Sequence, residues 1–170
     1  MSSPAPLEGP ELLTGSHELG AFDCGKAALN AYLVRFALVN QLSGTARTYV
    51  AHRGSRVVGY YSLAAAAVEA ASAPARVSKG LARHPIPLTL LARLAVDKAE
   101  QGSGLGSALL KDAFKKFLLA QEFVASRALL VHAKDEEAAR FYRRYGFDAS
   151  HIDTYHLYML TKDIKKTLAR

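Results

Sequence analysis

Cysteine is nearly absent from this chain, which has only Cys24 among its 170 residues. No disulfide can form within the chain, so we expect a cytoplasmic protein in which Cys24 is a buried or unreactive thiol. The apolar run Leu63–Val68 is far shorter than the roughly 20 residues that cross a bilayer, and the start of the chain does not read as a signal peptide. No spacing of cysteine and histidine indicates a metal ligand set. We therefore expect neither a membrane protein nor a metal site.

Acidic residues are scarce relative to basic ones. Fifteen Asp and Glu stand against 22 Lys and Arg, which leaves a formal net charge of +7. A basic surface raises the local concentration of polyanions, so nucleic acid is the first partner to consider. Arg76, Lys79, Arg83 and His84 form a patch between two predicted strands. For the basic segment 162–166, a nucleic-acid contact and a solubilising role stay equally open.

The length and composition predict one folded domain. Half of the residues are hydrophobic, which is enough for a sizeable core, but 170 residues are few for two domains. Residues 1–9 are rich in proline, serine and alanine and lack periodicity, so we expect a flexible tail there. The predicted domain covers residues 10–170.

A glycine loop joins a predicted strand to a predicted helix. Residues 90–97 form an apolar run, residues 107–120 are amphipathic, and Gln101–Gly106 lies between them. Glycine allows a ligand to approach the backbone, and the helix that follows adds unpaired N–H groups and a positive dipole end. Such a loop suits a phosphate group. A glycine-rich turn that binds nothing is the alternative.

The glycine spacing narrows the choice of phosphate ligand. Ser107 stands where the dinucleotide fingerprint needs its third glycine, and no Gly-Lys-Ser/Thr follows as in a P-loop. The remaining pattern, Gln-x-x-Gly-x-Gly, resembles the pyrophosphate-binding loop of the GCN5-related N-acetyltransferases (GNAT), which bind coenzyme A. The resemblance implies acetyl-CoA as co-substrate. It would be held by the main chain of Leu94, Ala95 and Val96 and by Gln101, Gly102, Ser103, Gly104, Leu105 and Gly106.

A second pattern stands behind the loop. Residues 128–133 predict a short strand, and Asp135 is a suitable N-cap for the helix after it, with Gly146 suited to the position after the last turn. Four residues of this helix share one face at i, i+3, i+4 and i+7: Ala138, Phe141, Tyr142 and Tyr145. The pattern A-x-x-F-Y-x-x-x-G-F resembles the closing helix and turn of the GNAT fold. Many relatives have an asparagine seven residues before the tyrosine; this chain has Asp135, so we assign it a capping role only.

The remaining segments predict alternating strands and helices. Residues 23–26 introduce a helix with an apolar stripe made by Leu29, Tyr32, Leu33 and Phe36. Strands at 48–53 and 56–63 flank Gly54-Ser55, a pair that suits a type II′ hairpin. A helical segment near 77–83 and a last strand at 155–160 complete the order. We predict an α+β GNAT fold, with a mixed, mostly antiparallel sheet of six or seven strands and about four helices.

Three further segments resemble the acetyltransferase toxins of bacterial type II toxin–antitoxin systems: residues 29–33, 40–50 and 85–97. The resemblance covers nearly everything after the first twenty residues. It implies a toxin that acetylates the amino acid on charged tRNA and so stalls translation. It also implies a ribbon-helix-helix antitoxin, through which operator DNA would mainly be contacted in repression. We also expect a homodimer.

The chemistry of the predicted central strand agrees with such a substrate. Acetyl transfer needs a neutral amine, stabilisation of the oxyanion and a proton for the leaving thiolate. Many GNAT relatives place a glutamate on this strand as a base, but Leu88–Val96 has no carboxylate and Asp97 comes only at its end. An α-amino group has a pKa near ~7.7–8.0, against ~10.4 for lysine, so part of it is uncharged without a base. The missing base favours an α-amine acceptor.

Tyr142 is the candidate general acid, because a phenol with a pKa near ~10 stays protonated at neutral pH and can donate to a thiolate. The alternative is a core aromatic, which is also our interpretation of Tyr145. For RNA phosphates we select Arg47, Arg83 and Arg93; for Arg93, on the strand face opposite Leu94 and Val96, a structural ion pair is equally open. We interpret Arg140, Arg143 and Arg144 as residues on the solvent-exposed face of a helix rather than as phosphate contacts. His132 is interpreted as a structural histidine rather than a base.

These observations predict a toxin N-acetyltransferase that acts on aminoacyl-tRNA. Two alternatives stay open. One is an acetyltransferase for a small amine or a protein N-terminus, which would not need a basic surface. The other is a co-repressor without catalysis, whose charge would serve DNA and whose function would survive the loss of Tyr142.

Overall fold

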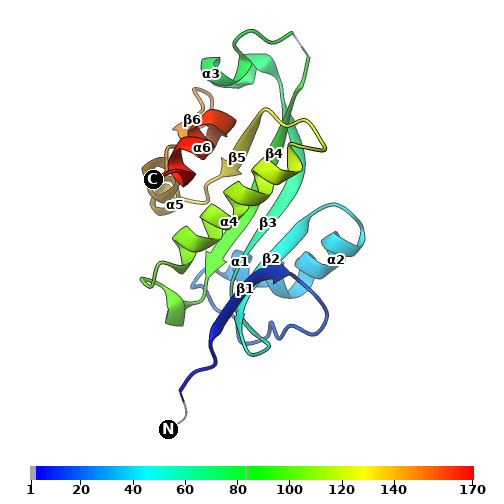
Figure 1. The fold of residues 1–170 in the computed structure, drawn as a ribbon, viewed down its shortest axis with the longest axis vertical. Coiled ribbons are helices and arrows are strands. Elements are labelled where there is room, and N and C mark those ends of the chain that lie inside the picture. The colour runs from blue at the N-terminus through cyan, green and yellow to red at the C-terminus, as the bar shows by residue number, and fades with distance from the viewer. Residues whose placement is uncertain (1–2, 83) are drawn as a thin grey trace. The chain divides into compact units, whose positions relative to one another are not determined.

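The computed structural model describes residues 3–82 and 84–170 (Figure 1). Within them, seven strands are formed: β1 Leu7–Leu12, β2 Arg47–Arg53, β3 Arg56–Val68, β4 Ile86–Val96, β5 Ala128–His132, β6 Asp148–Ala149 and β7 His156–Leu160. The α-helices are α1 Ala27–Ala31, α2 Ala37–Leu42, α3 Ala75–Ser78, α4 Leu105–Ala120, α5 Glu136–Arg144 and α6 Thr161–Leu168. A π-helical turn, Tyr32–Phe36, joins α1 to α2, and 3₁₀ turns are found at Ala70–Ser72 and Lys98–Glu100.

The strands form a mixed sheet in the order β1-β2-β3-β4-β5-β7-β6. Pairing is antiparallel for β1 with β2, β2 with β3, β5 with β7 and β6 with β7, whereas β4 and β5 are parallel. This arrangement confirms the predicted α+β fold with a mostly antiparallel sheet. No helix of the described chain is both long and apolar enough to span a membrane.

The chain forms two compact units, and β3, β4 and α4 contribute residues to both. The first unit consists of residues up to 64 and of residues 92–113, and the second consists of residues 65–91 and 114–170. The single domain over residues 10–170 stays a prediction. The predicted flexible tail over residues 1–9 is too long at its end, because Leu7–Gly9 belong to β1. There, Leu7 and Glu8 pair with Arg53 and His52 of β2.

In the first unit, the helical segment from α1 to α2 packs its apolar side into a cluster with β2 and β3. Leu33 and Val50 are fully buried there, and the buried Tyr60 donates from its hydroxyl to the carbonyl of Leu29 at 2.7 Å. The predicted stripe was wrong at its last position, since Phe36 is 52% exposed while Ala37 is fully buried. The π-helical turn inserts one extra residue into the helix, and this shifts the buried face by one position.

The β2–β3 hairpin has the predicted turn. Gly54 has a φ of +56°, and Ser55 does not have a positive φ, as a type II′ turn requires. Further along β3, Gly59 lies against the first turns of α4: a Cβ at this position would be 3.0 Å from Leu109 Cδ1 and 3.1 Å from Leu105 Cδ2. The absence of a side chain at Gly59 therefore lets the start of α4 approach β3 closely.

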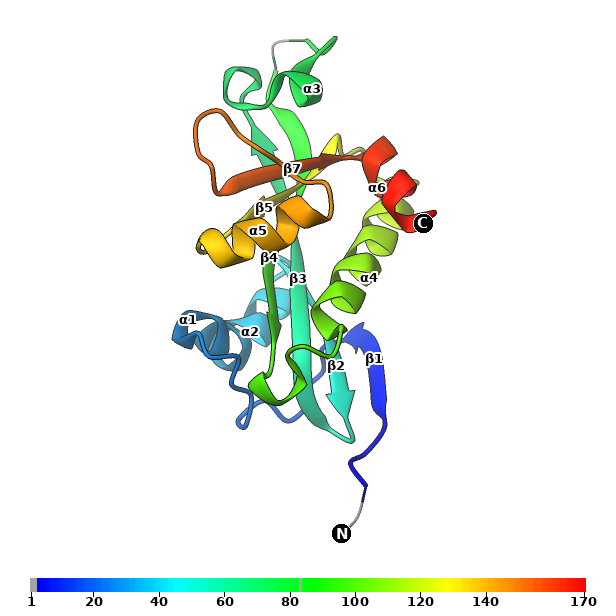
Figure 2. The ribbon, with the colours of Figure 1, turned by 90° about the vertical axis from the view of Figure 1, so that its left-hand side faces the viewer.

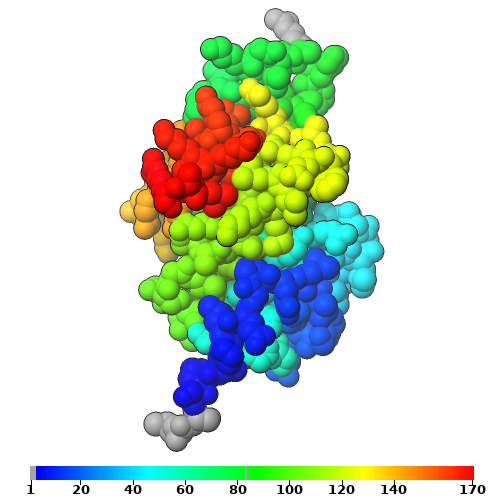
Figure 3. Space-filling view, in the orientation of Figure 1, coloured from blue at the N-terminus to red at the C-terminus, as the bar shows by residue number. Residues whose placement is uncertain are grey.

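In the second unit, β5 and β7 form the centre, and α5 lies against them (Figure 2). Phe114 of α4 packs on Phe147, and Ile164 of α6 is fully buried. Figure 3 shows α6 on the surface of this unit. The sequence analysis predicted neither α6 nor β6. The segment 162–166, which lies in α6, was considered only for its charge, and β6 consists of two residues. The predicted helix near 77–83 is shorter than expected and ends at Ser78, and Arg83 lies outside the described residues.

The contact at Gly59 makes a stability prediction. Gly59→Val should lower the free energy of unfolding by about 1–3 kcal/mol, because a branched side chain would overlap two leucines of α4. Urea unfolding measures this change. Gly20→Val is the matched control, since a Cβ at Gly20 meets nothing within 4 Å, and it should alter stability by no more than about 0.5 kcal/mol. Equal stability of the two variants would contradict the close packing at Gly59.

Candidate active site

The glycine loop has the backbone conformation that glycine alone adopts easily. Gly102 and Gly104 have φ values of +81° and +90°, and α4 begins immediately afterwards at Leu105. A Cβ at either glycine would meet nothing within 4 Å. The loop is therefore open on its outer side, next to helix N–H groups that have no partner inside the helix. This geometry fits a pyrophosphate bound by main-chain groups.

The side chains of the loop serve to hold it in place. Gln101 Nε2 donates to the carbonyls of Val96, at 2.9 Å, and Cys24, at 3.0 Å. Ser103 Oγ donates to the carbonyl of Glu100. Since these polar side chains are already hydrogen bonded within the protein, we expect Gln101 and Ser103 to act on a ligand through the backbone rather than through the side chain.

An ion pair supports the residues before the loop. Arg53 Nε lies 2.7 Å from Glu100 Oε1, and the two side chains are only 23% and 12% exposed. The hydrogen bond from Arg53 lowers the pKa of the Glu100 carboxyl below its ordinary value. A lowered pKa makes Glu100 a weaker base, and both of its oxygens already accept hydrogen bonds from Arg53, so we assign it no part in the proton transfer.

Strand β4 leads into the loop. Thr89, Leu90 and Leu91 pair in parallel with Leu129, Leu130 and Val131 of β5, and β4 continues to Val96 past the last of these pairs. Ala95 is buried, whereas Leu94 and Val96 are half-buried. The main chain at residues 94–96 is therefore the part of β4 to consider for the pantetheine arm.

Asp97, the carboxylate at the end of β4, is buried and fully used by the backbone. One oxygen accepts from the N–H of Ala99 at 2.9 Å, and the other accepts from the N–H of Asp23 at 3.1 Å. A carboxylate with two such hydrogen bonds holds the turn together. It leaves the strand without a free base, in agreement with the sequence.

Tyr142 belongs to α5, in the second unit. The side chain of Asp135 caps this helix by accepting from the N–H of Ala138 at 2.9 Å, which confirms the predicted N-cap. Tyr142 is 6% exposed and packs edge-on against Phe141 and Phe147, with ring centroids 5.2 and 5.4 Å apart. Burial raises the pKa of its phenol above the ordinary value, so it stays protonated at neutral pH. Within the described chain, its hydroxyl hydrogen bonds to no other residue.

The neighbours of Tyr142 have structural roles. Tyr145 contacts Phe141, with ring centroids 5.2 Å apart, and its carbonyl accepts from Thr167. His132 stacks on His156 at 4.1 Å between ring centroids. These contacts agree with the interpretation of Tyr145 as a packing residue and of His132 as a structural histidine.

The arginines selected for RNA differ in their surroundings. Arg47 is exposed at the start of β2. Arg93 places its guanidinium 4.6 Å from the centroid of the Tyr32 ring and donates to the carbonyl of Ala92. Its partner in the first unit is therefore an aromatic ring, not the carboxylate of an ion pair. Arg83 lies outside the described residues, so the structure places two of the three.

A basic groove in the second unit is formed by residues from three segments that are far apart in the sequence. It is lined by Arg76, Lys79, Arg127, Leu160, Thr161, Lys162 and Lys165. Arg76 is neutralised by Asp148 and Asp163, at 2.8 and 2.7 Å. Among the described residues, no carboxylate is paired with Lys79, Lys162 or Lys165. The groove therefore keeps an uncompensated positive charge, which sequence reasoning could not localise because its members come from three segments.

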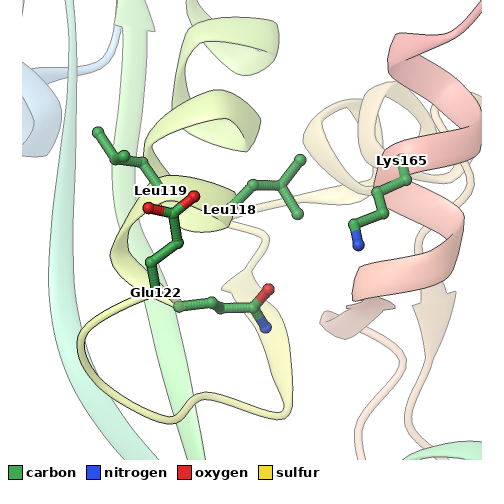
Figure 4. A pocket seen from close by; sticks show the side chains of 5 residues that line it. Leu118, Leu119, Glu122 and Lys165 are labelled. Atoms are coloured by element: carbon green, nitrogen blue, oxygen red, sulfur yellow. The ribbon is translucent and has the colours of Figure 1, made fainter.

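A second pocket of this unit is lined by Leu118, Leu119, Gln121, Glu122 and Lys165 (Figure 4). It lies at the carboxyl end of α4, whereas the glycine loop precedes the amino end of that helix. The amide of Gln121 already donates to Ser126 and Thr161, each at 2.7 Å. We assign this pocket no part in the reaction.

Comparison with known proteins agrees with this geometry. Residues 44–149 match the model of the acetyltransferase (GNAT) domain. The chain belongs to the GNAT family. It is 42% identical over 156 residues to a tRNA-acetylating toxin of Mycobacterium tuberculosis, a match that covers 92% of this chain and 93% of that protein.

Solved GNAT structures are similar over nearly the whole chain. A tyrosine-to-phenylalanine mutant of KacT matches with a TM-score of 0.87 and 28% identity, covering 96% of this chain and 99% of that one. AtaT in complex with acetyl-methionyl-tRNAfMet matches at 0.85 and 30%, covering 95% and 97%. A tyrosine-to-phenylalanine mutant of AtaT, bound to the C-terminus of the antitoxin AtaR and to acetyl-CoA, matches at 0.81 and 28%, covering 97% and 98%.

The open glycine loop makes a binding prediction. Gly104→Glu should weaken the binding of coenzyme A by at least about tenfold (~1.4 kcal/mol), because it places a negative charge where the loop would hold pyrophosphate. Gly44→Glu is the matched control, since Gly44 also has a positive φ, of +79°, and open space around it. Both variants should lose about 1–2 kcal/mol of stability through backbone strain. Calorimetric titration with coenzyme A separates them, and equal affinities would remove the loop from the site.

Proposed function

We propose that this protein transfers the acetyl group of acetyl-CoA to the α-amino group of the amino acid on charged tRNA, and that it thereby blocks translation as a toxin. The observation that carries the proposal is the 42% identity to a tRNA-acetylating toxin over nearly the whole of both chains. The similarity to AtaT in complex with acetyl-methionyl-tRNAfMet supports the same substrate.

In the proposed reaction, the amine nitrogen attacks the thioester carbonyl and forms a C–N bond, after which the C–S bond breaks. The amine loses a proton and the departing thiolate gains one. No carboxylate base is needed on β4, because an α-amino group with a pKa near ~7.7–8.0 is partly neutral at physiological pH. The engagement of both oxygens of Asp97 by backbone N–H groups supports this choice of acceptor.

Tyr142 is the proposed acid that protonates the thiolate. Its raised pKa keeps the proton on the phenol until a strong acceptor forms, and no described residue competes for its hydroxyl. The solved tyrosine-to-phenylalanine mutants of KacT and AtaT support a tyrosine of special importance in these proteins. The pattern A-x-x-F-Y-x-x-x-G-F selects Tyr142 as the tyrosine with that role in this chain.

Acetyl-CoA would be bound in the first unit. The backbone N–H groups of residues 101–106 and the start of α4 would hold the pyrophosphate. The main chain of Leu94, Ala95 and Val96 would hydrogen bond the pantetheine arm. The complex of AtaT with acetyl-CoA supports the choice of co-substrate.

The tRNA phosphates would be contacted by Arg47, Arg83 and Arg93, as proposed from the sequence, and by the basic groove of the second unit. Within that groove, Lys79, Lys162 and Lys165 are the strongest candidates, because the charge of Arg76 is already matched by Asp148 and Asp163. For Arg93 the contact with Tyr32 is a competing structural role.

The proposed partners follow from the same relatives. The structure of AtaT with the C-terminus of AtaR supports an antitoxin for this chain. We propose that this antitoxin is of the ribbon-helix-helix type and makes most of the contacts with operator DNA, and that the toxin is a homodimer. Charged tRNA is a cytoplasmic molecule, so the reaction would take place in the cytoplasm.

The assigned role of Tyr142 gives a catalytic prediction. Tyr142→Phe should slow acetyl transfer by about 10²–10⁴-fold, because it removes the proton donor, while the affinity for acetyl-CoA should stay unchanged. The rate is measured with purified charged tRNA, and uncharged tRNA and lysine-containing peptides should not be acetylated.

Tyr145→Phe is the matched control for this experiment. It removes a hydroxyl from the same helical face, and it should keep a rate within about threefold of the wild type, a change of less than ~1 kcal/mol. Growth arrest in the absence of antitoxin should follow the same order. If Tyr142→Phe acetylates as fast as Tyr145→Phe, Tyr142 is only a core aromatic.

The basic groove gives an ionic-strength prediction. Lys162→Glu and Arg47→Glu should each weaken tRNA binding, and log affinity should fall with log salt with a slope of about 0.7 to 0.9 for each phosphate contact. Lys115→Glu, an exposed lysine of α4, is the control with the same change in net charge. Binding of tRNA that does not depend on salt, or an equal loss in the control, would argue against this surface and favour a small-amine substrate.

A further inference from the structure

Glu11, His17 and His52 form a cluster in the first unit that the proposed acetyl transfer does not use. Glu11 is on β1, His52 is on β2, and His17 is in the connection that follows β1. The side chains offer one carboxylate oxygen and two imidazole nitrogens, and these three atoms all lie within 4.8 Å of one another. Strands β1 and β2 are adjacent in the sheet (Figure 2).

The ring of His52 presents a buried nitrogen that has no hydrogen-bond partner. His52 is 5% exposed, and its Nδ1 lies 2.6 Å from the carbonyl oxygen of Gly54, so Nδ1 carries a proton. Within the described chain, Nε2 makes no hydrogen bond: Glu11 Oε1 is only 2.6 Å away but lies off the donor direction of the ring. In neutral His52 the Nε2 lone pair faces the Glu11 carboxylate oxygen at 2.6 Å, a repulsive contact between two acceptors that a cation shared by both atoms would relieve.

The ring of His17 can also present its Nε2 to a shared ligand. Nε2 lies 3.0 Å from Glu11 Oε1, and Nδ1 accepts from the N–H of Thr14 at 3.0 Å. Thr14 Oγ1 lies 3.3 Å from the same Nδ1 and can accept a proton from it. Metal binding through Nε2 would move the ring proton to Nδ1, which would then donate to Thr14 Oγ1, and the ring would have to turn away from the Thr14 N–H that now donates to Nδ1.

We propose that Glu11, His17 and His52 bind one transition-metal ion, and that this ion is Zn²⁺. Two imidazole nitrogens and one carboxylate oxygen suit Zn²⁺, whereas Mg²⁺ and Ca²⁺ prefer oxygen ligands alone. Water would complete the tetrahedron.

Movements of about 1.5 Å or less would form such a site, because the three ligand atoms already lie within 4.8 Å of one another. In a tetrahedral zinc site, ligand atoms are about 3.3 Å apart, given metal–ligand distances near ~2.05 Å. The Glu11 oxygen lies 2.6 and 3.0 Å from the two histidine nitrogens, so it has to move outward by less than an ångström relative to His52. Its side chain is 55% exposed and has room to do so. The hydrogen bond from His52 Nδ1 to Gly54 fixes that ring as metal-binding histidines are usually fixed.

The competing explanation is an ion pair without a metal, in which His52 is protonated and attracted to the Glu11 carboxylate. The hydrogen bond from His17 lowers the pKa of Glu11, so the carboxylate is anionic in either case. The two explanations differ in their response to added metal. A bound ion would join β1, β2 and the segment at His17, and so would stabilise the first unit against unfolding.

Zinc titration of the full chain, prepared without a histidine tag, tests the proposal. We expect binding of one Zn²⁺ by calorimetry, a rise in Tm of about 5–10 °C at a hundredfold excess of zinc over the Kd, and the visible absorption of four-coordinate Co²⁺. Excess Mg²⁺ should not compete. Glu11→Gln and His52→Gln should each weaken zinc binding by at least about tenfold, because the loss of a group that merely orients a metal ligand already weakens binding by that much. Glu11 is exposed, so its substitution should not disturb folding.

His156→Gln is the control, because His156 belongs to the stacked pair with His132 outside the cluster. It should bind zinc as the wild type does. The absence of stoichiometric binding, or binding that survives both Glu11→Gln and His52→Gln, would overturn the proposal and leave the ion pair. Loss of binding in His156→Gln would assign the metal to the other histidine pair. The readouts are independent of acetylation, so they do not depend on the proposed function.

Discussion

The turn between β4 and α4 is the constraint on which the proposed coenzyme site depends. Two side chains hold it: Asp97 accepts hydrogen bonds from the N–H groups of Asp23 and Ala99, and Gln101 donates to the carbonyls of Cys24 and Val96. With the turn fixed, Gly102 and Gly104 can adopt positive φ values and leave the backbone open before the first turn of α4. Gly59 on β3 lets that first turn pack closely. An anion site made of backbone N–H groups needs this rigidity, because the groups cannot reorient around the ligand.

The side chains that could perform chemistry are few, and this limits the reaction. Asp97 and Glu100, the carboxylates that come just before the loop, are both engaged in structural hydrogen bonds. The proposed proton donor is the buried phenol of Tyr142, whose raised pKa keeps it protonated at neutral pH, so that it can donate a proton but not accept one. Such a site suits an acceptor that is already partly neutral, as the α-amine of an aminoacyl-tRNA is. The uncompensated lysines of the basic groove are consistent with a polyanionic carrier of that amine.

Local patterns allowed much of the fold to be predicted. The hairpin at Gly54-Ser55, the loop before α4 and the Asp135 cap of α5 each depend on neighbours a few residues apart, and each is found where expected. Errors arose where a distant contact or an irregular turn decides the structure. The π-helical turn at Tyr32–Phe36 moves Phe36 out of the core, β1 forms only because β2 is there to pair with it, and α6 buries Ile164 although its sequence is dominated by charge. The site residues were selected by the same local patterns, which could not show that the guanidinium of Arg93 lies over the ring of Tyr32, a residue far away in the sequence.

The sequence by itself determined the resemblance to the GNAT family, because the glycine-rich turn and the amphipathic helix on which it rests lie in short, contiguous segments. It also determined the excess of positive charge and the lack of a carboxylate on β4. Only the tertiary structure decided that residues 76, 79, 127, 160–162 and 165 line one groove, that both oxygens of Asp97 accept backbone hydrogen bonds, and that Glu11, His17 and His52 converge. The physical reason is that these groupings depend on strand pairing and helix packing, which bring together residues that no periodicity or spacing along the chain relates.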